Sequence, residues 1–175
     1  MNDKDFNRVS ALAGLDLDYT ALKSELNSYS ILAAKVAGTE LSEINLLDSY
    51  TQWTVASASG NDNQKPRESA VCNYTIKEEN AFETRLDLDE RFKNSPYVLK
   101  EGFKFYYGIP LKLKNSITLG SLCVAGKNLE HLDTTQVEQL HLIAQQIEQY
   151  LSLKHELNIV EEQLKQQHLI TRRLA

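Results

Sequence analysis

The sequence contains few of the features that mark secreted, membrane-bound or nucleic-acid-binding proteins. Its two cysteines cannot form a disulfide framework, and its three prolines leave no proline-rich linker between domains. Acidic residues number 24 and basic residues 19, so the chain lacks the basic surface that a general nucleic-acid binder needs. No apolar run approaches the roughly 20 residues of a membrane span, and the start of the chain does not resemble a signal peptide. We therefore expect a cytoplasmic protein without nucleic-acid or membrane partners.

The residues that are present are typical of one soluble globular domain. Hydrophobic residues make up 42% and charged residues 25% of the chain. Apolar side chains recur three and four positions apart over 19–38 and predict a helix that ends at Gly38. Alternating patterns over 43–48 and 52–58 predict a β-hairpin, whereas 59–67 has almost no apolar residue and predicts a solvated loop.

The second half of the chain combines short helices with further strands. The predicted elements are short helices over 68–76 and from Ser95-Pro96, a helical turn over 87–92, and strands over 81–86, 103–111 and 119–125. The strand over 103–111 should bury one face only, because its other aromatic residues alternate with Lys104 and Tyr106. Gly120 indicates that a neighbouring backbone approaches closely. Antiparallel strands clustered between helices predict an α+β fold.

From Thr134 nearly to the end of the chain, the pattern predicts one long helix, with Thr135 and Glu138 as its capping box. A single apolar stripe should run along it, formed by Val137, Leu140, Ala144, Ile147, Tyr150, Leu153, Leu157, Val160 and Leu164. The spacing of this stripe breaks between Ile147 and Leu153, which predicts a local overwinding of a coiled coil. Beyond this break the other faces are polar, so we expect a protruding dimeric coiled coil.

Five short segments occur in an order and spacing that match a known family. They are Asp48–Trp53, Val71–Ile76, Asp89–Pro96, Phe105–Leu111 and Leu119–Val124. Together they resemble a GAF domain of the type found in bacterial sensor histidine kinases and diguanylate cyclases, over about 24–151. The resemblance implies a PAS-related antiparallel sheet of six strands with helices on both sides. It also implies that the terminal helices pair in a dimer and that the last helix continues into an output domain.

This resemblance divides the chain into three parts. Residues 1–18 form an N-terminal lead-in that is expected to be loose or weakly helical. Residues 19–150 form the GAF domain, and residues 151–175 form a signalling coiled-coil helix.

The resemblance implies sensing rather than catalysis, through a small-molecule pocket on one face of the sheet. The ligand is unidentified, and no cofactor, metal site or catalytic residue is expected. Candidate ligand contacts are Trp53, Cys72, Tyr74, Asp87, Phe92, Phe105 and Tyr107. The aromatic residues among them would equally suit an ordinary core, and Asp87 with Arg91 would equally suit a surface ion pair. The family commonly has histidine at the position of Tyr74, so no histidine contact carries over.

Cys72 and Cys123 allow two interpretations. As an activated thiol pair they would serve redox sensing or catalysis, as in GAF-like free methionine sulfoxide reductases. As small buried side chains they would only fill the core, and we favour this because neither has a cysteine, histidine or lysine beside it in the sequence. Covalent bilin attachment, as in phytochrome-related GAF domains, is rejected because Asn73 and Val124 stand where histidine usually follows the cysteine.

The expected function is a sensory or regulatory domain of a signal-transduction protein, with a sensor histidine kinase as the expected full-length protein. His155-Glu-Leu157 faintly resembles a phospho-acceptor box, but a coiled-coil position is the favoured interpretation. The expected partners are a second copy of the chain, paired through the terminal helices, and an output domain in the same polypeptide. A ligand-free dimerisation spacer and a thiol-dependent methionine sulfoxide reductase remain as alternatives.

Overall fold

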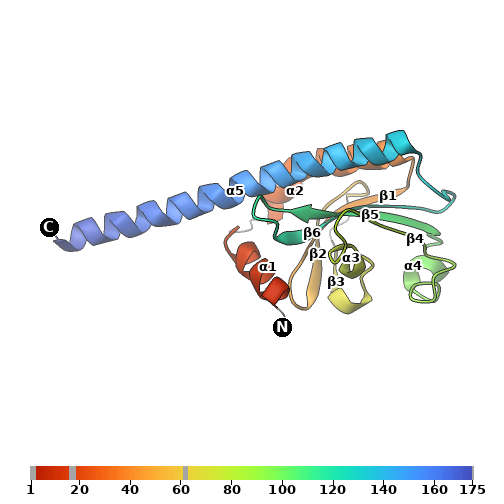
Figure 1. Cartoon of the computed structure of the whole chain (residues 1–175), viewed down its shortest axis with the longest axis horizontal. Helices are drawn as coiled ribbons and strands as arrows, with labels where there is room; N and C mark the ends of the chain where they lie inside the picture. The colour runs from red at the N-terminus through yellow and green to blue at the C-terminus, as the bar shows by residue number, and fades with distance from the viewer. Residues whose placement is uncertain (1–2, 16–18, 61–62, 175) are drawn as a thin grey trace.

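Six antiparallel strands form one sheet in the order β3-β2-β1-β6-β5-β4, with helices on both of its faces (Figure 1). The computed structural model describes residues 3–15, 19–60 and 63–174. The strands are β1 (Leu41–Leu47), β2 (Thr51–Ser57), β3 (Asn63–Pro66), β4 (Phe82–Arg85), β5 (Phe105–Lys112) and β6 (Thr118–Gly126). The helices are α1 (Asp3–Ala13), α2 (Tyr19–Ala37), α3 (Cys72–Thr75), α4 (Pro96–Leu99) and α5 (Thr134–Leu174), with a 3-10 turn η1 (Arg67–Ser69). The expected α+β class is confirmed.

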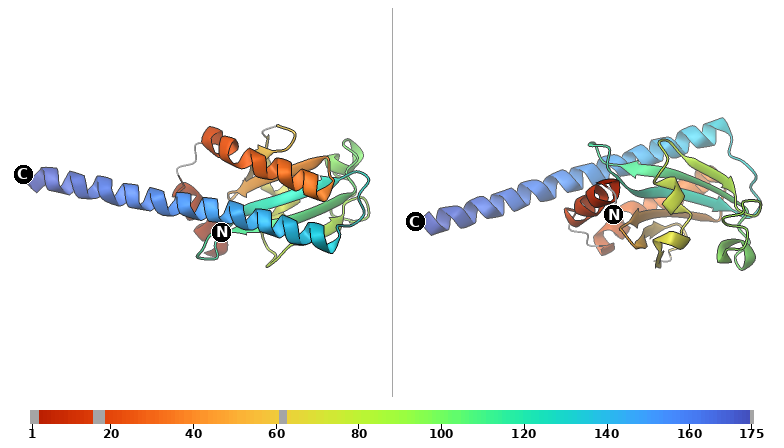
Figure 2. Two further views of the ribbon diagram at one scale, coloured as in Figure 1. Left: turned by 90° about the horizontal axis from the view of Figure 1, so that it is seen from above. Right: turned by 60° about the horizontal axis from the view of Figure 1, so that its bottom comes forward.

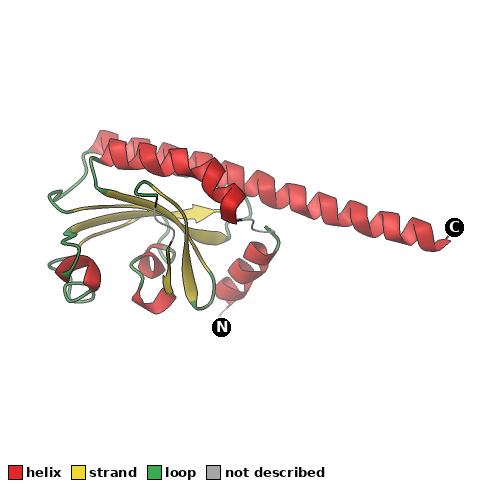
Figure 3. Cartoon of the chain, turned by 180° about the vertical axis from the view of Figure 1, so that it is seen from behind, coloured by secondary structure: helices red, strands yellow, loops and turns green. Residues whose placement is uncertain are grey.

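Long helices cover one face of the sheet and short helices cover the other. α2 and α5 lie side by side across the sheet (Figure 2) and enclose the larger apolar core, which includes Leu26, Leu122 and Leu140. The opposite face carries η1, α3 and α4 (Figure 3) over a smaller core that includes Leu86 and Phe103. Both faces of the central strands are therefore buried, as in a three-layer arrangement.

In the segment 59–67, which was predicted as a loop, the described residues include an edge strand. β3 pairs with β2 through the register Thr51↔Pro66 to Thr54↔Asn63. β3 pairs through backbone groups, and an edge strand can expose polar side chains without cost. The sequence of β3 therefore has no apolar alternation from which the strand could be predicted. The prediction of a solvated loop was wrong for this reason.

The prediction that β5 buries only one face was also wrong. Tyr106 is buried as completely as its neighbours, because α3 covers the face of the sheet on which it lies. The predicted alternation is confirmed from Phe105 onward, but Phe103 precedes the strand and lies in the same core as Tyr106. What covers the second face depends on segments far away in the sequence.

α5 begins two residues earlier than the predicted capping box implies. The backbone N–H of Gln136 donates to Asp133 Oδ1 (2.8 Å), and the backbone N–H of Asp133 donates to Gln136 Oε1 (2.9 Å). This reciprocal pair is a capping box, and it replaces the predicted pair of Thr135 and Glu138. Gln136 Nε2 also donates to the carbonyl of Val36 (3.0 Å), so the start of α5 is tied to the end of α2.

Two glycines have the backbone roles that the sequence predicted. Gly38 ends α2 with a φ of 66°, in the left-handed region. A Cβ on Gly120 would lie 1.8 Å from the carbonyl oxygen of Asn45 on β1. The close approach predicted from Gly120 is therefore confirmed.

α5 carries two apolar stripes on different faces rather than one continuous stripe. Leu140, Ile147 and Leu151 face the sheet and are buried, whereas Leu153 and Leu157 are exposed. At about 100° per residue, Leu153 lies about 140° around the helix from Leu140. A straight helix with two faces accounts for the spacing, and the predicted overwinding is not needed.

Within the lead-in, Asp3–Ala13 form a regular helix that packs on the body, so the expectation of a loose or weakly helical segment was wrong for these residues. α1 buries Arg8 and Ala11, and Asn158 Nδ2 on α5 donates to the carbonyl oxygen of Gly14 (3.3 Å) just beyond α1. In the part of the chain that the structure describes, no helix combines the length and the apolarity that crossing a membrane requires.

Candidate functional site

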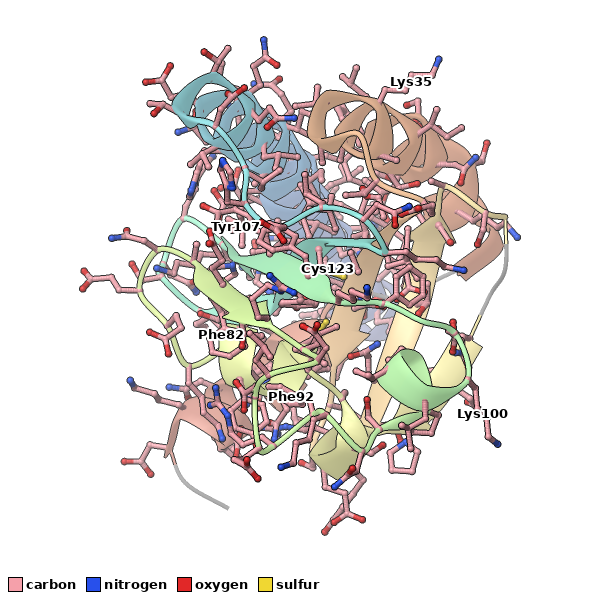
Figure 4. All side chains as sticks on the ribbon, turned by 90° about the vertical axis from the view of Figure 1, so that its right-hand side faces the viewer. Lys35, Phe82, Phe92, Lys100, Tyr107 and Cys123 are labelled. Atoms are coloured by element: carbon pink, nitrogen blue, oxygen red, sulfur yellow. The ribbon has the colours of Figure 1, made fainter. Side chains whose placement is uncertain are left out.

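The sheet divides the predicted ligand contacts between its two faces. Phe105 and Tyr107 belong to the core under α2 and α5, whereas Cys72 and Phe92 belong to the core on the other side. Figure 4 shows Tyr107 on the side of the long helices, with Phe82 and Phe92 beyond the sheet. The seven predicted residues therefore do not form one pocket.

Trp53 also lies on the face of the long helices. It stands opposite Leu46, which belongs to the core on that side. Its indole N–H donates to Asp48 Oδ2 (3.1 Å), so the polar atom of the ring is used within the β1–β2 hairpin. Trp53 therefore stabilises the hairpin and does not reach the other face.

The remaining predicted contacts form an outer layer of aromatic and ion-pair contacts. Tyr74 and Phe92 pack edge to face with ring centroids 5.1 Å apart, and the guanidinium of Arg91 lies 4.8 Å from the Tyr74 ring. Arg91 pairs with Asp89 (2.6 Å) and not with Asp87, which pairs instead with Arg85 (3.0 Å). Asp87 thus belongs to a surface ion pair, the second of the two interpretations above.

Arg85 and Asp89 complete these pairs. The ion pair and hydrogen bonds to Arg91 hold the pKa of Asp89 well below its usual range, and those to Arg85 lower the pKa of Asp87. Both carboxylates stay charged at neutral pH and face their own arginines.

A small cavity lies between the sheet and the α3–α4 layer, on the face that carries Cys72. Its volume is about 30 Å³, which is room for about one water molecule. Its lining residues with polar side-chain groups are Glu43, Gln52, Lys65, Cys72, Tyr97, Tyr106 and Cys123. Of these residues, the sequence had indicated only Cys72 as a ligand contact.

Charged groups close one side of the cavity. The ammonium of Lys65 on β3 contacts the hydroxyl of Tyr97 on α4 and lies 4.6 Å from the centre of its ring. Burial raises the pKa of Glu43 although Lys65 opposes the shift, and burial raises the pKa of Tyr97 to about 12. Burial by itself would lower the pKa of Lys65, but Tyr97 and Glu43 together raise this pKa above its usual value. An ammonium beside a partly buried carboxyl therefore faces the cavity.

Gln52, one of the residues that line the cavity, carries an unsatisfied acceptor. Its side chain is 1% exposed, and its Oε1 has no hydrogen-bond partner among the described residues. Leaving a buried carbonyl unpaired costs about 1–3 kcal/mol. A donor that reached Gln52 Oε1 would remove this penalty.

The two thiols lie side by side in the wall of the cavity. Cys72 Sγ and Cys123 Sγ are 4.0 Å apart, and Asn45 Nδ2 lies 3.4 Å and 3.5 Å from them. The hydroxyl of Tyr106 lies 3.3 Å from Cys72 Sγ. The hydrogen bond between the thiols lowers the pKa of Cys72 and raises that of Cys123. The argument that neither cysteine has a cysteine beside it holds along the sequence but fails in space.

β5 links this face of the sheet to the long helices. The hydroxyl of Tyr106 hydrogen bonds with Thr75 Oγ1 of α3 (2.8 Å), while the hydroxyl of the next residue, Tyr107, lies 3.1 Å from His141 Nε2 on α5. At the end of β5, the backbone N–H of Lys112 donates to Glu148 Oε1 (2.8 Å). Neighbouring residues of one strand therefore touch the cavity layer and α5.

A wider cleft of about 770 Å³ lies beside α1, and three of its charged residues, Asp5, Arg8 and Arg67, pair with one another. Arg67 donates to Asp5 Oδ1 (3.0 Å), Asn73 Oδ1 (2.8 Å) and the carbonyl of Asp48 (3.0 Å). Burial, with a smaller effect from Arg67, lowers the pKa of Arg8 to about 10. These contacts fasten α1 to the body, and we assign the cleft a structural role.

The alternation of polar and apolar residues along β1 could have indicated part of the cavity lining. Glu43 and Asn45 alternate with Ile44 and Leu46 on β1, which places both polar side chains on one face. That face would be solvated in a two-layer protein, but α3 and α4 cover it here. Lys65 had no such signal, because it lies in the segment predicted as a loop.

Comparisons with known proteins agree with this architecture. A family model described as GAF domain matches residues 9–151. The chain is 40% identical over 98 residues to Cyclic di-GMP phosphodiesterase PA2567 of Pseudomonas aeruginosa, a match that covers 54% of this chain and 17% of that protein. This chain therefore spans only a small part of that relative's length.

Solved structures share the fold at low sequence identity. The GAF domain of phosphoenolpyruvate-protein phosphotransferase from Acinetobacter has a TM-score of 0.63 at 14% identity, covering 90% of this chain and 98% of that one. A domain described as belonging to a two-component sensor histidine kinase from Sinorhizobium meliloti 1021 has a TM-score of 0.54 at 13% identity, covering 74% of this chain and 90% of that one. At these identities the similarity concerns the fold alone.

Proposed function

The chain belongs to the GAF domain family, and on that premise we propose that it is the sensory domain of a cytoplasmic signal-transduction protein. It binds a small polar ligand between the sheet and the α3–α4 layer. It passes the bound state through α5 to an output domain in the same polypeptide, and it works as a homodimer. The chain itself catalyses no reaction, so the chemistry belongs to the output domain.

The single observation that carries this proposal is the unpaired Oε1 of Gln52 in the wall of the cavity. A ligand with an N–H or O–H group would satisfy this acceptor and remove the penalty of burying it. The carboxyl of Glu43 and the ammonium of Lys65 line the same cavity, so groups of either charge on the ligand would find a partner. We therefore propose a ligand that is small and polar.

A ligand larger than water requires the cavity to open. α4 has four residues and buries none of them, and β3 is a four-residue edge strand. Lys65 and Tyr97 join these two elements across the cavity. Such weakly packed elements move at little cost, so separation of β3 from α4 is the proposed entry route.

The relay to α5 runs through β5. A change at Cys72 or Thr75 reaches Tyr106, whose neighbour Tyr107 contacts His141 on α5. A ligand can shift α5 only if it binds one arrangement of these contacts more tightly than another. The two tyrosines supply contacts on which such a difference can depend.

The exposed stripe of α5 is the proposed dimer seam. It consists of Leu153, Leu157, Val160 and Leu164, which are spaced four, three and four residues apart. α5 has 41 residues and extends well beyond the body of the domain (Figure 1), so this stripe is available to a second copy. Pairing the two stripes would give the parallel coiled coil that a signalling helix needs.

The output domain remains to be identified, and the relatives favour one class. The relative at 40% identity is named as a cyclic di-GMP phosphodiesterase, whereas the similarity to the histidine kinase domain concerns the fold alone. We therefore place an enzyme of cyclic di-GMP turnover ahead of a histidine kinase as the output that this domain regulates.

Thermal unfolding of the purified chain with a panel of amino acids, amines and short organic acids tests ligand binding. A ligand at about 100 times its Kd adds roughly 2.7 kcal/mol, which raises the Tm by roughly 5–10 °C for a domain of this size. Gln52→Met should abolish the shift without lowering the Tm of the free protein, since it removes an unsatisfied acceptor. Gln64→Met on β3 is the matched control, because Gln64 is exposed and outside the cavity.

The small volume of the cavity favours a second candidate, the ligand-free dimerisation spacer. About 30 Å³ accommodates a water molecule, and a bound water would also satisfy Gln52. If no member of the panel changes the Tm of the wild-type chain, the spacer replaces the sensor as the proposed function.

A further inference from the structure

We propose that Cys72 and Cys123 are a redox-active pair in which hydrogen peroxide forms a reversible disulfide that joins α3 to β6. The modification requires only the two thiols and a peroxide, and it does not depend on ligand binding. It gives the cavity wall a second input besides a bound molecule.

The geometry brings the two sulfur atoms within reach of each other. Their distance is 4.0 Å, and a disulfide requires about 2.0 Å, so they must approach by about 2 Å. Cys123 lies on a central strand between β1 and β5, whereas Cys72 begins the four-residue helix α3. Rotation of both side chains and a small shift of α3 would close the gap, because α3 is the less constrained of the two elements.

The surroundings of Cys72 favour its thiolate. Asn45 Nδ2 and the hydroxyl of Tyr106 both lie within hydrogen-bond reach of its sulfur, and the Cys123 thiol lies beside it. The hydrogen bond with the Cys123 thiol is the largest effect that lowers the pKa of Cys72, to about 7, and Ser121 and Tyr106 add to it against the opposing effect of burial. Since the thiolate is the nucleophile, Cys72 reacts first and Cys123 resolves the product.

The proposed reaction has two steps. The Cys72 thiol first loses its proton, and the resulting thiolate attacks one oxygen of hydrogen peroxide. The O–O bond breaks and the departing hydroxide takes up that proton to form water, which leaves a sulfenic acid on Cys72. The thiol sulfur of Cys123 then attacks the Cys72 sulfur, the S–O bond breaks, and the hydroxyl group leaves with the Cys123 proton as a second water. Two thiols are oxidised to one disulfide while one peroxide is reduced to two waters.

The position of the pair selects for a small oxidant. The two side chains are 3% and 2% exposed, so a bulky disulfide such as oxidised glutathione does not reach them in the folded chain. Both line the cavity of about 30 Å³, and hydrogen peroxide is little larger than the water molecule that such a volume holds. The cavity therefore provides the route for the oxidant.

The disulfide would act on the same contacts as the proposed ligand. Drawing Cys72 toward β6 changes its contact with Tyr106, the residue before the one that touches α5. This consequence for α5 rests on the proposed sensory function, whereas the disulfide itself does not.

Intact mass spectrometry and thiol alkylation of the whole chain test the inference. The reduced protein is treated with hydrogen peroxide, unfolded in denaturant and alkylated with a maleimide. We expect the loss of two hydrogen atoms, no alkylation of either cysteine, and full recovery of both thiols after treatment with dithiothreitol. Cys123→Ser should instead accumulate an oxygen adduct on Cys72, and Cys72→Ser should leave Cys123 alkylatable.

Two results would overturn the inference. One is alkylation of both cysteines when the wild-type chain is treated with peroxide in its folded state and then unfolded, and the other is a disulfide between chains rather than within one. Because the wild-type chain carries the main measurement, a variant that fails to fold does not affect the conclusion. A missing disulfide with an intact ligand-induced Tm shift would refute only the redox pair, and the converse would refute only the ligand proposal.

Discussion

Leu157→Ala is the substitution that tests the proposed dimer seam of α5 most directly. Leu157 is 56% exposed in the single chain, and it lies in the stripe that runs from Leu153 to Leu164. Alanine is the best helix former, so the substitution shortens the side chain without weakening the helix. Ile159→Ala is a matched control, because Ile159 is 43% exposed but lies about 160° around the helix from Leu157.

The expected effect follows from the surface that pairing would bury. Removing about three methylene equivalents from a fully buried leucine costs roughly 2.4 kcal/mol, at about 0.8 kcal/mol for each group. Only the exposed 56% of the Leu157 side chain is still to be buried on pairing, which gives about 1.3 kcal/mol per copy. Two copies lose about 2.5 kcal/mol, so the Kd of the dimer should rise roughly 70-fold.

Sedimentation equilibrium of the whole chain over a concentration series measures this change. Wild type and Ile159→Ala should share one Kd, and Leu157→Ala should shift the midpoint to higher concentration. Equal weakening by both substitutions would show that the stripe is not the interface. A wild-type chain that stays monomeric at every concentration would refute the dimer itself.

Four further substitutions test the fold and the link to α5. Gly120→Ala should lower the free energy of unfolding by about 3 kcal/mol or more, because its Cβ would meet a backbone oxygen at 1.8 Å. Gly38→Ala should lower it by only about 1 kcal/mol, because alanine is strained in a left-handed backbone. Urea unfolding, followed by the fluorescence of the single tryptophan, compares the two variants. Leu140→Ala should cost about 2–5 kcal/mol in the same assay, because it empties a site in the core under α5. Burial lowers the pKa of His141, so acidification from about pH 7 to about pH 5 should destabilise the wild type more than His141→Gln, and an identical pH dependence would contradict this.

The order and type of most elements followed from periodicity. The three-and-four spacing predicted α2, alternation predicted β1, β2 and β5, and the apolar run with Gly120 predicted a closely packed central strand. These signals are local, because a side chain and its neighbours along an element determine them. β3 was not predicted, because backbone pairing and not a side-chain pattern holds it to β2.

The candidate site was predicted far less well. Of the seven proposed contacts, only Cys72 lines the cavity, while Phe105 and Tyr107 lie on the other face of the sheet. Gln52 and Lys65 were missed because polar residues in a strand or loop are normally solvated. Aromatic residues were a poor guide, since they fill the core as readily as they line a pocket.

The sequence by itself determined which residues share a face of each helix and strand, because the periods of 3.6 and 2 are properties of the backbone. It thereby determined the α+β class and the long helix, whereas the division of its apolar residues into a buried and an exposed stripe became apparent only in the structure. Only the tertiary structure decided what covers each face, and so whether Glu43 and Gln52 meet bulk solvent or a small cavity. It also decided that Cys72 and Cys123, 51 positions apart, meet at 4.0 Å, because packing of α3 on β6 and not spacing along the chain brings them together.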